Sequence, residues 1–352
     1  MFIYFTIYFV AAYAAINNAS KVARSSKIVW IIVGLVLTVI IGLRHHVGGD
    51  WNNYYKRFYQ LGYMTYEEAI GIKDVGYQTI AYMVHDLGWG EMYLVNFICA
   101  IFFVTGLIVF LRRQPNAWLG LTVAIPYLII VVSMGYTRQA IAIGFVMWGL
   151  AALDRGKFKS FLFFVFLAVL FHKSAILMMA FGIFQQGKGK LIKVASIGLA
   201  GAGIWFSFVD QGADVLIKNY LVDNTEYESQ GAMVRVLLNL LPAILLLVYR
   251  KEWKRSFNDF GLWFMVALAS IASVGLVSFA STAVDRMALY FIPIQLVVFA
   301  RLPYLARKKV SPKTTTVLIV LLYALVMYVW LFHAANSRYW VPYQNIIFYD
   351  LL

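Results

Sequence analysis

The chain has 352 residues, of which 62% are hydrophobic and only 13% are charged, and its formal net charge is +14. This composition leaves too little polar surface to cover a soluble domain, which excludes a soluble enzyme. A bilayer core needs about 20 apolar residues per helix, and such stretches follow one another along this chain. We therefore expect an all-α polytopic membrane protein, with residues 1–352 forming a single integral membrane domain.

Twelve apolar segments are predicted to cross the membrane. In chain order they cover residues 2–16, 28–43, 92–111, 117–134, 138–153, 160–172, 174–186, 194–209, 233–249, 260–280, 286–300 and 314–333. The seventh is short and could form a broken or re-entrant pair with the sixth. No long internal repeat is visible, which argues against a transporter built from two inverted halves.

Alternate loops between these segments are basic. The loops that follow the first, third, fifth, seventh, ninth and eleventh segments hold 20 of the 30 basic residues and three of the 16 acids. The positive-inside rule makes these loops cytoplasmic and both termini external. The excess charge is therefore a topology signal and does not indicate a nucleic-acid partner. The long outer segments are 44–91, 210–232 and the tail 334–352.

The first outer segment begins with a run of residues that are rich in chemistry, Arg44-His45-His46-Val47-Gly48-Gly49-Asp50-Trp51-Asn52-Asn53-Tyr54-Tyr55. Its tyrosines could form a wall that stacks on sugars or an aromatic belt at the membrane interface, and the belt is the favoured interpretation for most of them. The two adjacent histidines lack further ligands and make a weak metal signal, so we expect no metal. Farther along, residues 74–91 have apolar side chains at helical spacing. This pattern fits an interfacial helix or a helix packed on the bundle.

Four cations share one unusual position, the first turn of a helix whose N-terminus faces out: Arg138, Lys173, Arg235 and Arg286. A cation is electrostatically misplaced at a helix N-terminus, and a bound anion would reverse that cost. Arg44 enters the same layer from the end of the second segment. We therefore predict an outward-facing pocket for pyrophosphate or a similar anion. The alternative is that each cation reaches the headgroups or pairs with an outer acid, as Arg286 would with Asp285.

Two residues of this layer are candidates for proton transfer. His172 ends the sixth segment, where a histidine can act as a base near neutral pH. Asp50 follows the Gly48-Gly49 pair, which allows a sharp turn, and it could instead pair with charge or simply cap that turn. The sequence contains no Walker loop, dinucleotide glycine pattern or HExxH motif, so we expect no cofactor.

These landmarks together resemble the EpsG family of Wzy-like exopolysaccharide and O-antigen polymerases. The motifs that carry the resemblance are Arg44…Val47-Gly48-Gly49-Asp50…Tyr54, Asp74-Val75-Gly76-Tyr77, Arg138-Gln139-Ala140-Ile141-Ala142, His172-Lys173-Ser174-Ala175, and Arg286 with Tyr290. The resemblance spans roughly residues 40–295, and the order and spacing of the motifs make it specific. His45 and His46 are not expected of the family, and no role is carried onto them.

The resemblance implies a GT-C-like glycosyltransferase on the outer face of the bacterial plasma membrane. A glycan on undecaprenyl pyrophosphate would be transferred, with inversion and without metal, to a sugar hydroxyl of another lipid-linked repeat unit. Arg138 and Arg286, with Arg44 and Arg235, would neutralise the pyrophosphate, and Asp50 or His172 would act on the acceptor hydroxyl. The remaining substrate-binding residues would be Lys173, Tyr54 and Tyr290. A chain-length regulator and a flippase of the same pathway would be possible partners.

Three other functions fit parts of the sequence. An O-antigen ligase-like transferase would use the same donor, but such ligases carry a larger outer loop than 210–232. A transporter or lipid flippase would place polar residues near the middle of the membrane, whereas here they gather in one outer layer. A membrane acyltransferase would also use a histidine near the membrane, but it would not need three or more arginines.

Overall fold

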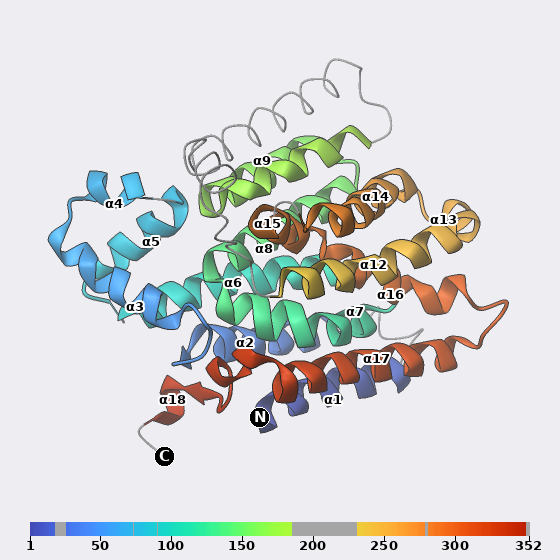
Figure 1. The fold of residues 1–352 in the computed structure, drawn as a ribbon, viewed down its shortest axis with the longest axis horizontal. Helices are drawn as coiled ribbons and strands as arrows, with labels where there is room; N and C mark the ends of the chain where they lie inside the picture. The colour runs from blue at the N-terminus through green and yellow to red at the C-terminus, as the bar shows by residue number, and fades with distance from the viewer. Residues whose placement is uncertain (18–25, 73, 90, 185–230, 279–280, 350–352) are drawn as a thin grey trace.

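The computed structural model describes residues 1–17, 26–72, 74–89, 91–184, 231–278 and 281–349, and these form a bundle of helices (Figure 1). The α-helices are α1 (Phe2–Asn17), α2 (Lys27–Gly42), α3 (Trp51–Gln60), α4 (Tyr66–Ile72), α5 (Val75–Asp86), α6 (Glu91–Leu111), α7 (Ala117–Ala124), α8 (Thr137–Leu153), α9 (Phe158–Phe171), α12 (Ala232–Val248), α13 (Arg250–Ser256), α14 (Phe260–Leu276), α15 (Ser281–Phe291), α16 (Pro293–Leu305), α17 (Pro312–His333) and α18 (Ile346–Tyr349). A π-helix continues α7 over Ile125–Ser133, and 3₁₀ helices cover Leu61–Tyr63, Lys173–Phe184 and Ala335–Tyr339.

The predicted all-α fold is confirmed, and the predicted apolar segments that fall on described residues coincide with helices. The eighth segment, 194–209, lies outside the described residues, as does most of the loop 210–232. Among the described helices, α6 and α17 are each long and apolar enough to cross a membrane. The bent pairs α12–α13 and α15–α16 raise the number to four if each pair is one span. The other apolar helices have 10–17 residues, so the count of twelve spans stays a prediction.

Helix α8 is the centre of the bundle, because nearly all of its side chains are buried. It packs on α6 and α9, and its backbone touches that of α6. A Cβ atom added to Gly106 of α6 would lie only 2.1 Å from the carbonyl oxygen of Gly144 in α8. Small residues allow helices to approach this closely. The contact fixes the height of α8 in the bundle, and with it the position of the residues at both of its ends.

The C-terminal segment closes over the turn that follows α2. Strand β1 (Arg44–His45) pairs in antiparallel fashion with β2 (Gln344–Asn345). The backbone N–H of Gly48 donates to the carbonyl of Tyr339 at 2.8 Å. The Trp340 ring fills the space beside Gly135, where a Cβ would meet it at 2.7 Å. The turn after α2 and the turn before α8 are therefore held together by the end of the chain.

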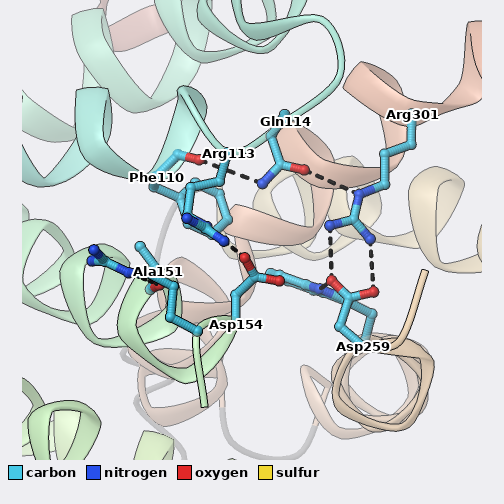
Figure 2. Close-up of polar contacts among 9 residues, drawn as sticks. Phe110, Arg113, Gln114, Ala151, Asp154, Asp259 and Arg301 are labelled. Carbon is cyan, nitrogen blue, oxygen red and sulfur yellow. Dashed lines mark hydrogen bonds and ion pairs between the residues drawn. The ribbon is translucent and has the colours of Figure 1, made fainter. Parts of the chain in front are cut away.

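At the other end of α8 a buried ion pair joins α14 to α16. Arg301 donates through Nη1 and Nη2 to the two carboxylate oxygens of Asp259, at 2.7 and 2.8 Å, and through Nε to Gln114 at 3.0 Å (Figure 2). The indole N–H groups of Trp253 and Trp263 also donate to Asp259. We call this group the Arg301–Asp259 lock. The sequence predicts that Arg301 lies in the loop after the eleventh segment. In the structure it lies inside α16, and its side chain is only 5% exposed.

Candidate functional site

Arg138, at the start of α8, meets two segments of the region 44–91. Its Nη1 donates to Asp74 Oδ2 at 2.6 Å, and its guanidinium lies 5.8 Å from the centre of the Tyr54 ring. Asp74 sits just before α5 in a left-handed conformation, with φ 47°. Tyr54 is a buried residue of α3. The predicted residues Arg138 and Tyr54 are therefore brought together, and Asp74 is added to them as the partner of the arginine.

The guanidinium of Arg138 is only partly satisfied. Among the described residues, its buried Nε has no hydrogen-bond partner, and its side chain is still 22% exposed. A ligand cannot reach a fully buried atom, so an anion would accept from the exposed part of the guanidinium, where a charge-assisted hydrogen bond is strong. Arg138 thus combines a fixed position with unused hydrogen-bonding capacity, which is what an anion site requires.

His172 lies next to the turn that carries Asp74, because α5 packs on the end of α9. A Cβ on Gly76 would come within 3.0 Å of the Phe171 ring and 3.1 Å of the Leu170 carbonyl. Directly after these residues, His172 ends α9, and its Nδ1 is 3.0 Å from the hydroxyl of Tyr290. A hydroxyl on one ring nitrogen fixes the orientation of the ring.

Helix α15 brings two more predicted residues to this place. Arg286 and Tyr290 lie one turn apart on α15, and Gln139 of α8 donates through Nε2 to the Arg286 carbonyl at 2.9 Å. Lys173 follows His172 and has an exposed side chain. The start of α8, the end of α9 and the helix α15 therefore gather Arg138, His172 and Tyr290. Gln139 binds the backbone of Arg286, which lies in the middle of α15 and not in the first turn of a helix, where the sequence predicts it.

Arg235 occupies a neighbouring position with its charge already balanced. It is buried in α12 and pairs through Nη1 with Asp285 Oδ2 of α15, and its guanidinium lies 5.7 Å from the centre of the Tyr136 ring. The sequence had left open whether Asp285 pairs with the adjacent Arg286; the pairing seen here is with Arg235. A contact of Arg235 with substrate stays a prediction.

Arg44 is turned into the core. It is 1% exposed, and the hydrogen bonds of its guanidinium go to neutral acceptors: the carbonyls of Ile41 and Val47, at 2.6 and 3.1 Å, and the side chains of Asn96 and Thr137, at 3.5 and 2.8 Å. Thr137 directly precedes Arg138. Arg44 therefore ties the turn after α2 to the start of α8, and its predicted contact with pyrophosphate stays a prediction.

Asp50 lies close enough to Arg138 for their charges to interact. It precedes α3 and makes no side-chain capping bond to that helix. Burial raises the pKa of Asp50 above its usual value, and a hydrogen bond from Asn53 and the charges of Arg138 and Arg57 offset only part of that effect. A carboxylate with a raised pKa is better matched to accepting a proton than an exposed one.

The histidine pair after Arg44 is packed among aromatic rings. His45 hydrogen-bonds through Nδ1 to the hydroxyl of Tyr93, and burial and the neighbouring His46 lower its pKa. Within the part of the chain that the structure describes, no three His, Cys, Asp or Glu side chains gather as a metal site would require.

Sequence reasoning missed two residues that organise the site. Asp74 stood in the quoted Asp74-Val75-Gly76-Tyr77 motif, and a buried acid with a glycine two residues later was the available signal. Gln139 followed Arg138 in another quoted motif.

A cavity of about 200 Å³ beside Arg113 and Asp154 is lined by none of the predicted site residues. It lies at the opposite end of α8, about 25 Å away by helix length.

The sequence matches the EpsG family over residues 27–345. The chain belongs to the EpsG family. No curated protein and no solved structure is significantly similar to it. Membership of this family, together with the apolar helices, identifies a membrane protein with a role in exopolysaccharide polymerisation in general.

Proposed function

We propose that this EpsG-family protein is a Wzy-type polymerase that works on the outer face of the bacterial plasma membrane. The donor is a glycan on undecaprenyl pyrophosphate, and the acceptor is a sugar hydroxyl of a second lipid-linked repeat unit. The observation that carries the proposal is the partly satisfied Arg138, held by Asp74 next to the His172–Tyr290 pair. An anion site beside a proton acceptor fits transfer from a pyrophosphate leaving group.

In the proposed reaction the acceptor oxygen attacks the anomeric carbon from the side opposite the pyrophosphate. The new carbon–oxygen bond forms as the bond to pyrophosphate breaks, so the configuration inverts. The leaving oxygen keeps the bonding electrons, and undecaprenyl pyrophosphate departs. Charge grows on the pyrophosphate in the transition state, and fixed donors stabilise it there more than in the ground state. Arg138 and Arg286 supply these donors, and Lys173 adds a further cation at the exposed edge.

The hydroxyl proton needs an acceptor, and two residues are suitably placed. His172 hydrogen-bonds through Nδ1 to Tyr290, and in the tautomer in which Nδ1 donates, Nε2 is the basic nitrogen. Asp50 has a raised pKa and lies near Arg138. We propose His172 as the base, because it ends α9 next to the turn that carries Asp74, the partner of Arg138. We propose Asp50 as the residue that orients the acceptor. The donor already carries an activated leaving group, so this scheme needs neither a nucleotide nor a metal.

The proposal is tested by reconstituting the purified protein in liposomes with lipid-linked repeat units. The lipid-linked repeat units are extracted from the source organism after deletion of the gene that encodes this protein. A polymerase yields a ladder of lengthening lipid-linked glycans. A single transfer to a different acceptor would indicate a ligase, and movement of the lipid across the bilayer without transfer would indicate a flippase.

Arg286→Ala protein should elongate about 10²–10³-fold more slowly, because one transition-state donor is lost. Its insertion and folding are checked by its elution from a size-exclusion column in detergent. Elongation near the wild-type rate would remove Arg286 from the proposed site. The outward orientation has a separate test, since a reporter fused after Leu352 should respond on the outer side of the membrane.

A further inference from the structure

Helix α3 presents two different faces. Trp51, Tyr54 and Phe58 are buried, and their spacing of three and four residues places them on one side of the helix. The remaining side chains of α3 are exposed. The buried side packs toward Arg138 through Tyr54, so the exposed side starts at the edge of the candidate site.

Part of this exposed side forms a line that leads away from Asp50. Asn53, Arg57 and Gln60 follow Asp50 at steps of three or four residues, which places them along one edge of α3. We call these three residues the α3 stripe. Asn53 hydrogen-bonds to Asp50, and the charge of Arg57 acts on the same carboxylate. The stripe is therefore continuous with the group that also interacts with Arg138.

The α3 stripe offers polar chemistry directly beside Asp50. Two amides and a guanidinium offer donors and acceptors to a ligand rich in hydroxyl groups. Other exposed side chains of the segment 44–91 are mixed: Ile72, Met83 and Trp89 are apolar and suit hydrocarbon or the membrane interface, whereas Lys56, Glu67 and Glu68 are charged. Over its ten residues α3 is about 15 Å long, which is enough for more than one sugar ring.

We infer that the α3 stripe binds the oligosaccharide of the lipid-linked substrate and leads it to Asp50. This inference rests on the proposed function and adds to it the surface that holds the sugar chain. Asn53 and Gln60 hydrogen-bond to sugar hydroxyls, and Arg57 donates to the same chain. Loss of the stripe weakens substrate binding and so raises KM. Because Asn53 and Arg57 also act on Asp50, the binding measurement is the readout that reports the stripe itself.

The helix contains its own matched controls. Asn52 and Lys56 are four residues apart, like Asn53 and Arg57, and each is an exposed neighbour of the same or similar chemistry. They lie about 100° farther round the helix, away from Asp50. The experiment compares the double variant Asn53→Ala/Arg57→Ala with Asn52→Ala/Lys56→Ala. Both double variants remove one amide and one positive charge from exposed positions of α3.

Elongation is measured in liposomes with the extracted lipid-linked repeat units. Binding is measured by ligand-observed NMR, using the oligosaccharide released from them by mild acid as the probe. We expect the stripe variant to raise KM and the dissociation constant about 10-fold or more, because two hydrogen bonds are lost. The control variant should change either value less than about 2-fold.

Equal effects in the two double variants would overturn the inference, and so would no effect in either. If wild-type protein binds the oligosaccharide through the stripe but never elongates it, the proposed polymerase fails and the sugar-binding surface stands. If wild-type protein elongates while both variants keep the wild-type KM, the surface fails and the polymerase stands.

Discussion

An arginine–aspartate pair lies at each end of α8, and the two pairs differ in how fully the arginine is hydrogen-bonded. In the Arg301–Asp259 lock, Nε, Nη1 and Nη2 of the arginine all donate to protein oxygens, and its side chain is 5% exposed. At the other end, Arg138 donates through Nη1 to Asp74, keeps a buried Nε without a partner among the described residues, and is 22% exposed. A saturated arginine can only stabilise the fold, whereas a partly satisfied one can also bind a ligand.

The largest expected effect concerns the stability of the lock. Asp259→Asn leaves a buried guanidinium without its counter-charge, which should lower the free energy of unfolding by about 3–5 kcal/mol. Equilibrium unfolding of the purified protein in mixed micelles measures the loss. Asp154→Asn is the control, because Asp154 pairs with Arg113 while both side chains are more than a third exposed, at 38% and 35%. Such a pair contributes about 1 kcal/mol or less, so equal losses would contradict the distinction.

The lock also has a pH signature. Burial acts to raise the pKa of Asp259, but the hydrogen bonds and charge of Arg301 and the two indole donors hold that pKa below its usual value. A carboxyl whose pKa is lower in the folded state stabilises the fold above its unfolded-state pKa. That contribution is lost as the pH falls through the folded-state pKa. Wild-type protein should therefore lose stability in acid more steeply than Asp259→Asn protein.

The next effect concerns catalysis at the other end of α8. Arg138→Ala should slow elongation about 10²–10³-fold, because the transition state loses a fixed donor. Arg113→Ala is the matched control, since Arg113 also donates to a single aspartate, Asp154, but at the other end of the bundle. We expect it to elongate within about 2-fold of wild type. Comparable losses of elongation rate in the two variants, measured in the same liposomes, would show that Arg138 has no special role.

A smaller effect should appear in the pH dependence of elongation. If ionised Asp50 orients the acceptor, kcat/KM rises as the pH increases through the raised pKa of Asp50. The acidic limb of the profile should then lie above the range of an exposed aspartate. Asp50→Asn should remove that limb and lower the plateau about 10-fold or more. An unchanged limb in Asp50→Asn protein would assign the titration to another group.

The sequence predicted much of the fold because apolar runs and helices obey the same periodicity. Of the four cations predicted to lie in the first turn of a helix, Arg138, Lys173 and Arg235 do so, whereas Arg286 lies in the middle of α15. The sequence could not predict that Arg44 turns inward, because its acceptors are two carbonyls and the side chains of Asn96 and Thr137, which are far apart in the chain.

Pairing of charges was the other limit. The positive-inside rule counts cations in loops and says nothing of their partners, so Arg301 was read as part of a basic loop. Its partner Asp259 is 42 residues away, and Asp74 is 64 residues from Arg138. Such pairs depend on how helices pack against one another. Asp285 shows the same limit, since it bonds to Arg235 from another helix, whereas the sequence offered only its neighbour Arg286 as one alternative.

In the proposed polymerase, the residues around Arg138 bind the pyrophosphate of the lipid carrier. The most direct test is the affinity of the detergent-purified protein for undecaprenyl pyrophosphate, measured by competition with a fluorescent analogue of that lipid. Undecaprenyl monophosphate serves as the comparison ligand. We predict that Arg138→Ala weakens pyrophosphate binding about 10-fold or more, as expected for a lost charged hydrogen bond, while Arg113→Ala leaves it unchanged. Equal affinity of wild-type and Arg138→Ala protein for undecaprenyl pyrophosphate would contradict the claim.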